Sequence, residues 1–128
     1  MAFKLALALT TLLACSVPAS AQTLMRQFPA VALRGTLEVT QPPEVLINGQ
    51  PARLSPGSRI RGENNLLQMS GALVGQPLLV NYTRDSLGNV HLVWILSAEE
   101  AKKRPWPSTP VQAERWLFDP SAQTWTRR

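Results

Sequence analysis

The chain of 128 residues contains one Cys and one His, and only 16% of its residues are charged. Zinc clusters and disulfide frameworks need several Cys or His side chains, so this composition argues against both. The glycine-rich phosphate motifs GxGxxG and GxxxxGK(S/T) are absent as well. A hydrophobic fraction of 45% is too high for a wholly disordered chain. We therefore expect a single folded domain without a metal or cofactor.

Residues 1–21 have the pattern of a secretory signal peptide. Lys4 precedes the apolar run Leu5–Val17, Pro18 breaks that run, and Ala19–Ala21 supplies the small residues that a signal peptidase reads. The run is too short to span a bilayer, and no later stretch is long and apolar enough. This pattern predicts cleavage after Ala21 and an exported or periplasmic protein.

A second interpretation of the same leader involves its cysteine. The stretch Leu12–Cys15 resembles a bacterial lipobox, in which the Cys is lipidated and becomes the new N-terminus. Anchoring through Cys15 as a lipoprotein is therefore the minor alternative to simple cleavage. After cleavage at Ala21 the chain has no Cys, so its stability must come from its core.

The positive charge is concentrated at the C-terminal end. From Gln22 to Glu100, six Arg balance six acidic residues. From Ala101 onward there are two acidic residues and six basic ones, Lys102, Lys103, Arg104, Arg115, Arg127 and Arg128. This asymmetry indicates an acidic partner for the C-terminal segment.

Residues 33–97, which follow a lead-in at 22–32, have the pattern of an all-β body. Apolar and polar residues alternate over Leu33–Thr40, the period of a strand with one buried face. Asn48-Gly49 is a strong hairpin signal because both residues tolerate positive φ. Six to seven short strands predict a mainly β fold, a small barrel or roll of the SH3-like or OB-like kind. A flat two-layer sandwich is the alternative.

Within this body, Ala52–Leu54 is predicted to be a short return strand that ends at a turn formed by Ser55–Ser58. Leu66–Ser70 is predicted as a further strand, followed by a connection of uncertain shape. Val90–Leu96 is the most apolar run, and we expect it to be central in the sheet.

A short helix over 98–104 and a tail over 105–128 follow the body. Ser97 and Glu100 form the pattern of a capping box, which predicts the start of the helix. The prolines from Pro105 to Pro110 are expected to stop it and to impose an extended linker. Residues 116–126 either form a hairpin with paired aromatic residues or order only on a partner.

Several stretches of the body also resemble a family of small uncharacterised exported proteins of Gram-negative bacteria. These stretches are Ile47–Gly49, Ala52–Asn65, Ser70–Gln76 and Val80–Ala101. The resemblance covers roughly 33–104 and does not clearly include the tail. It implies an exported protein with a β-rich body, and it brings no established activity and no catalytic or binding residue.

The candidate binding residues in the body are arginines. Arg59 and Arg61 lie two positions apart, so their guanidinium groups share one strand face and could bind a carboxylate or phosphate. Arg53 is expected nearby, across the predicted turn. The alternative is a solvated face with pairing to Glu44 or Glu63. His91, the only histidine, is predicted to be structural or at the surface, because no nucleophile or acid is evident beside it.

The remaining candidates lie in the tail, where aromatic and basic side chains alternate. Such side chains can stack on sugars or sit at a membrane interface, or they can pack on the body. We assign no catalytic and no metal-binding residue. The tail candidates are Trp106, Trp116, Trp125, Arg127 and Arg128.

These features favour a non-enzymatic binding module of the periplasm or envelope. Its basic aromatic tail would contact peptidoglycan, lipid head groups or an envelope protein, and the predicted compartment disfavours nucleic acid. The alternative is a structural protein-interaction domain with the tail packed on its own barrel. A hydrolase or an inhibitor is less favoured, because the sequence offers no acid–base pair or nucleophile triad and no distinctive loop.

Overall fold

The computed structural model describes residues 25–128. The predicted signal peptide and the lipidation of Cys15 lie outside the described residues. Within residues 25–128, no helix combines the length and the apolar composition needed to cross a bilayer. Eight strands and three short helices make up this part of the chain.

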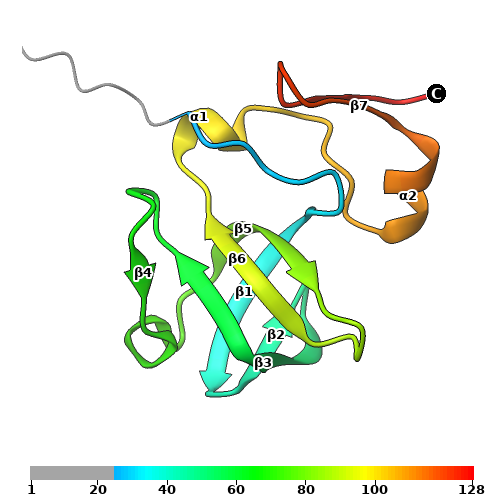
Figure 1. The fold of residues 1–128 in the computed structure, drawn as a ribbon. Helices are drawn as coiled ribbons and strands as arrows, with labels where there is room; N and C mark the ends of the chain where they lie inside the picture. Colours follow the sequence, from blue (N-terminus) through cyan, green and yellow to red (C-terminus); the bar gives the residue numbers. More distant parts are fainter. Residues whose placement is uncertain (1–24) are drawn as a thin grey trace, which may run out of the picture.

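Five strands close a small barrel, and a sixth extends it (Figure 1). Consecutive strands pair antiparallel around the ring, except that β3 and β6 run parallel. The pairing of β2 with β3 closes the ring, and β4 forms a short hairpin on β3. The strands are β1 (Leu33–Gln41), β2 (Glu44–Ile47), β3 (Gln50–Arg61), β4 (Leu67–Gln68), β5 (Leu78–Arg84) and β6 (Val90–Ile95).

The ring order β1-β2-β3-β6-β5 distinguishes the two predicted barrel types. In this order the third and the last barrel strands are neighbours and run parallel, which is the connectivity of an OB-like barrel. The prediction of a small β-barrel is confirmed, and the sandwich alternative is wrong. The strand β6 lies between β5 and β3, as its apolar composition predicts.

The barrel interior is filled by the inward-facing half of each strand. In β1, Leu33, Gly35, Leu37 and Val39 are buried and the residues that alternate with them face outward, as the pattern predicts. The hairpin between β2 and β3 turns at Asn48 (φ 52°) and Gly49 (φ 78°), which confirms the Asn-Gly signal. The complete inner cluster also contains Val45, Ile47, Leu54, Ile60, Leu73, Val80, Tyr82, Val90 and Val93.

The predicted turn at Ser55–Ser58 is wrong, because β3 continues through it. The parallel ladder pairs Leu54 with Val90 and Arg59 with Leu92, so Ser55–Ser58 bulges opposite the single residue His91. The Ser55 hydroxyl and His91 Nδ1 are 2.8 Å apart across this bulge. A bulge places extra residues in a strand without ending it, and the turn-forming residues Pro56 and Gly57 supply it here.

The predicted strand Leu66–Ser70 is shorter in the structure, where only Leu67–Gln68 pairs with β3. Ser70–Leu73 forms instead a 3-10 turn, η1. The helix α1 (Ala98–Ala101) begins at the predicted capping box: Ser97 caps the Glu100 amide, and the Glu100 carboxylate accepts the Ser97 amide. This helix ends three residues before the predicted end at Arg104.

The tail is folded along its length. Pro110 does not prolong an extended linker but begins the helix α2 (Pro110–Arg115), because a proline at the first helical position loses no hydrogen bond. The strands β7 (Leu117–Asp119) and β8 (Thr124–Thr126) then form a hairpin, the first of the two alternatives given for 116–126. Phe118 is directly opposite Trp125, and the two rings stack at 4.7 Å.

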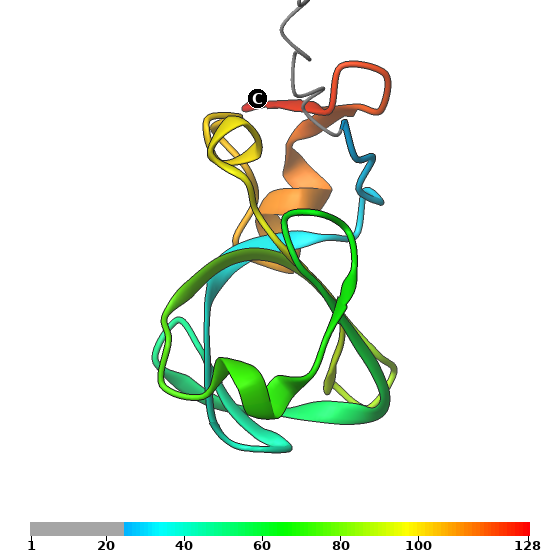
Figure 2. The same ribbon diagram turned by 90° about the vertical axis from the view of Figure 1, so that its left-hand side faces the viewer.

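Lead-in and tail together build a second core beside the barrel (Figures 1 and 2). The N-terminal segment, the helices α1 and α2 and the hairpin β7-β8 lie on the same side of the ring. Phe28 and Ala32 of the N-terminal segment are buried with Leu96, Trp106 and Trp125. Segments from opposite ends of the sequence therefore depend on each other for burial of their apolar side chains.

An ion pair fixes the lead-in to the helix α1. Arg26 donates from Nε to the Glu100 carboxylate at 2.9 Å, and from its terminal nitrogens to the carbonyl oxygens of Gly62 and Ile95. The Arg26 and Glu100 side chains are 5% and 10% exposed. Because both charges are buried, loss of one partner would leave the other uncompensated, which is strongly destabilising.

We expect this pair to make stability depend on acidity. Burial alone would raise the pKa of Glu100, but hydrogen bonds and charge from Arg26 and the Ser97 amide outweigh it and hold the pKa below the ordinary 4.5. A carboxyl group whose pKa is lowered by folding stabilises the folded state at pH values above its ordinary pKa. This stabilisation is lost as the pH falls through the folded-state pKa. Glu100→Gln should therefore lower the free energy of unfolding by about 3 kcal/mol at neutral pH.

Urea unfolding from pH 7 down to pH 3 measures this effect. The difference between wild type and Glu100→Gln should shrink on acidification below pH 4.5. Glu99→Gln is the matched control, because Glu99 pairs with Lys102 at an exposed position. A difference that stays constant down to pH 3 would contradict the assignment.

Candidate functional site

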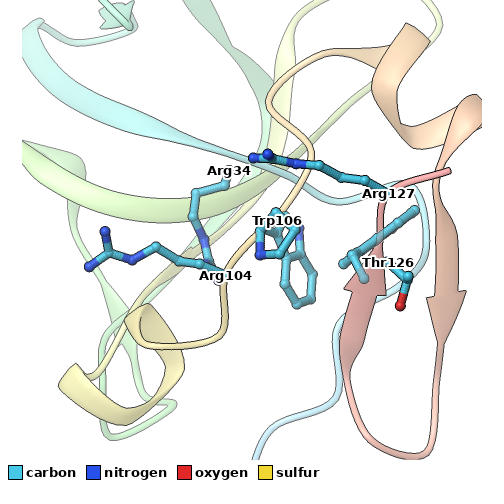
Figure 3. A pocket seen from close by; sticks show the side chains of 7 residues that line it. Arg34, Arg104, Trp106, Thr126 and Arg127 are labelled. Atoms are coloured by element: carbon cyan, nitrogen blue, oxygen red, sulfur yellow. The ribbon is translucent and has the colours of Figure 1, made fainter.

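An open pocket of about 640 Å³ lies where the barrel meets the C-terminal hairpin (Figure 3). Its wall combines guanidinium groups with the edges of two indole rings, and no carboxylate belongs to it. The side chains come from β1, from the linker after α1 and from the end of β8. They are Arg34, Arg104, Pro105, Trp106, Trp125, Thr126 and Arg127.

Trp106 is the centre of this pocket and of the second core behind it. Its ring makes edge-to-face contacts with Phe28, Phe118 and Trp125 at centroid distances of 5.8, 5.9 and 6.1 Å. The indole nitrogen donates to the Ala32 carbonyl at 3.0 Å. Such packing fixes the ring in one orientation, so the edge that borders the pocket is preorganised.

Arg34 covers the pocket side of Trp106. Its guanidinium carbon lies 4.8 Å from the Trp106 ring centre, in the range of a cation–π interaction. The same guanidinium donates to the carbonyl oxygens of Glu100 and Lys103 and to the Asn81 side chain. Arg34 therefore binds backbone carbonyl groups around the end of α1 and fixes the linker on β1.

The pocket environment weakens the proton affinity of Arg34. Burial lowers its pKa to about 10, Glu100 opposes this shift, and the nearby charge of Arg104 adds to it. The group remains charged at neutral pH. Because a second positive charge is close to it, an anion in the pocket would interact favourably with both guanidinium groups.

Arg104 and Arg127 are the exposed arginines of the pocket. Arg127 lies 5.2 Å from the ring centre of Trp116, which supports its side chain from the hairpin side. In the part of the chain that the structure describes, the ion pairs involve Arg26, Arg53 and Lys102, and none involves an arginine of the pocket. The pocket therefore carries uncompensated positive charge.

Three of the tail residues predicted from sequence meet in this pocket, namely Trp106, Trp125 and Arg127. Both indoles are largely buried, so only their edges line it. Trp116 is half-buried beside Arg127, and Arg128 follows at the exposed end of the chain. The structure brings together aromatic and basic side chains that the sequence placed in one segment.

The sequence prediction missed Arg34 and Arg104 as site residues. Arg104 belongs to the predicted basic cluster, so charge asymmetry was a usable signal for it. Arg34 was placed on the outer face of β1 by its period of two, and it does point outward. That face is covered by the tail, a contact between residues some 70 positions apart that periodicity cannot indicate.

The body arginines lie elsewhere. Arg59 and Arg61 share one strand face as predicted, and they border a separate small pocket of about 180 Å³ beside Trp94. Arg61 also donates to the Asn65 carbonyl at 2.9 Å. Arg53 forms the exposed ion pair with Glu44 that the sequence offered as its alternative, at 3.1 Å, and does not line that pocket.

His91 lies in β6, half-buried, and its neighbour is the Ser55 hydroxyl across the bulge. Among residues 25–128, no group of three or more His, Cys, Asp or Glu side chains is placed to hold a metal ion. The Ser–His contact is a pairing that the sequence did not reveal, because it depends on the parallel alignment of β3 with β6.

Comparisons with protein-family models, curated proteins and solved structures return no match for this chain. The resemblance to small exported Gram-negative proteins stays a prediction, and the barrel connectivity describes the fold alone.

We expect Trp106 to be the side chain on which both the pocket and the second core depend. Trp106→Ala removes a buried aromatic ring with three aromatic neighbours and should lower the free energy of unfolding by about 3–5 kcal/mol. Trp116→Ala, at a half-buried position, is the control and should cost less than about 2 kcal/mol. Equal losses for the two variants in urea unfolding would show that Trp106 has no special structural role.

Proposed function

We propose that this protein is an exported, non-enzymatic binding module of the periplasm or envelope. Its partner is an anionic envelope component, such as peptidoglycan or lipid head groups, and the contact is made by the pocket around Trp106. The observation that carries the proposal is the group of three arginines without a carboxylate at this aromatic pocket.

The chemistry of the pocket suits a carboxylate or a phosphate group. Arg104 and Arg127 are exposed and can donate paired hydrogen bonds to two oxygens of such an anion. Arg34, already held by backbone carbonyl groups, supplies a fixed charge behind them. Trp106 and Trp125 supply an apolar edge for the carbon part of the partner.

A binding role is favoured over catalysis by what lines the pocket. A general acid or base near neutral pH is usually a His or a carboxyl group, and the lining contains neither. The arginines bind and orient anions but do not exchange protons at this pH. The residues of the pocket can therefore hold a charged group, and they offer no proton transfer to it.

A structural protein-interaction domain is the second candidate function. The observation in its favour is the burial of Trp106 and Trp125, whose exposed fractions are 7% and 5%. Their rings complete the second core of this chain, so the tail is not free to wrap around a partner. In this alternative the outer faces of the folded tail would contact an envelope protein.

Co-sedimentation with anionic vesicles and with purified peptidoglycan tests the proposal. The full chain without its leader should bind one of them at low salt and release it at moderate salt. Arg104→Ser with Arg127→Ser should weaken binding by about 2 kcal/mol, or about 30-fold, because each basic side chain contributes about 1 kcal/mol at an anionic surface.

The matched control is Arg84→Ser with Arg115→Ser, which removes the same charge from exposed positions outside the pocket. This control should bind like the wild type. Equal weakening by both double variants would indicate a diffuse charge effect and would contradict a pocket. Salt-independent binding to an envelope protein would favour the second candidate.

A further inference from the structure

A second pocket is lined by residues of elements that lie at the end of the barrel away from the tail. Figure 1 shows the position of these elements. Its volume is about 450 Å³, within the usual range of ligand sites. The wall is formed by the β1–β2 turn, the bulged part of β3, the start of η1 and the β5–β6 loop. The lining residues are Pro42, Pro43, Arg53, Leu54, Ser55, Pro56, Ser58, Ser70, Leu87 and Asn89.

Apart from Arg53, the polar side chains of this pocket carry uncharged hydroxyl and amide groups. Ser55, Ser58 and Ser70 each bring a hydroxyl, which can donate and accept a hydrogen bond. Asn89 adds a carboxamide with both capacities. Such groups match a ligand that itself carries many hydroxyl and amide groups, since each partner can take either role.

The bulge in β3 holds part of this set in place. Ser55 is 5% exposed, and its hydroxyl is fixed by His91 Nδ1 at 2.8 Å. The backbone amide of Leu54 donates to the Pro43 carbonyl at 2.8 Å, which ties the bulge to the β1–β2 turn. Preorganised polar groups of this kind lose little entropy when a ligand binds.

The charge of this pocket is balanced. Arg53 is its one charged residue, and Glu44 lies 3.1 Å from the Arg53 Nε. This differs from the pocket around Trp106, where no carboxylate accompanies the arginines. An anion would therefore gain little electrostatic attraction in this pocket, and an uncharged ligand is favoured.

The rest of the wall is apolar and partly exposed. Pro42, Pro43 and Pro56 line it, and Leu87 is 83% exposed in the β5–β6 loop. An exposed leucine beside clustered prolines offers apolar area that the folded chain itself does not cover. A sugar ring offers both hydrogen-bonding groups and apolar surface, because its hydroxyl groups surround apolar C–H faces.

We propose that this pocket binds an uncharged glycan segment, by hydrogen bonds to Ser58, Ser70 and Asn89 and by apolar contact with Leu87. The site is separate from the pocket around Trp106, and it stands whether or not that pocket binds an anion. In combination, the two pockets would let one small barrel contact a sugar chain at one end and a negative group at the other.

The test is a titration of the isotope-labelled chain without its leader, followed by the backbone amide signals in NMR. The probe is chitotetraose, an uncharged, soluble tetramer of N-acetylglucosamine. Saturable shifts at Ser55, Ser58 and Asn89 are expected at millimolar probe, with the signals of Trp106 and Arg127 unchanged. Ser58→Ala with Leu87→Ala should weaken binding about tenfold.

Ser121→Ala with Val111→Ala is the matched control, since it removes a hydroxyl and an apolar side chain from exposed positions in the tail. It should leave the affinity for chitotetraose unchanged, and retained signal dispersion shows that each variant is folded. Absence of saturable shifts at the pocket overturns the proposal. Shifts there with a single-stranded oligonucleotide but not with the glycan overturn it as well.

Discussion

The packing of Trp106 against both ends of the chain is the interaction on which the rest of the structure depends. Its ring contacts Phe28 of the lead-in and Phe118 and Trp125 of the hairpin, and Arg34 of the barrel lies on its outer side. Without this ring, the lead-in, the hairpin and Arg34 would lose the aromatic surface that each of them contacts. The barrel core and the second core also meet, because Ala113 of α2 packs against both of them.

This arrangement also explains how a basic tail becomes a defined pocket. The barrel and the lead-in are electrically balanced, so the positive excess comes from the residues after Glu100. Folding of the tail onto β1 brings Arg104 and Arg127 to Arg34, which belongs to the balanced part. Charges that are spread along the sequence are thus concentrated at one edge of the barrel. The opposite end has balanced charge and a different set of polar groups.

The fold was predictable where the signal is local. The alternation in β1, the Asn-Gly turn, the capping box at Ser97 and the aromatic hairpin all depend on residues close in sequence, and all are found. The errors arise where tertiary contacts override local preference. Ser55–Ser58 has turn composition, but pairing on both sides keeps it in β3 as a bulge. Pro110 belongs to a proline-rich stretch with the composition of a linker, yet a proline is also well suited to begin a helix.

The sequence by itself determined the class of fold, the position of most strands and the segment that carries the positive charge. These properties follow from periodicity, turn residues and composition, which act over a few residues. Only the tertiary structure decided that Arg34 belongs with the tail arginines and that Ser55 lies beside His91. Both pairings join residues far apart in the sequence. Their positions follow from how the ring of strands closes and how the tail packs on it. The hydrophobic effect acts between apolar side chains whatever their separation in the sequence.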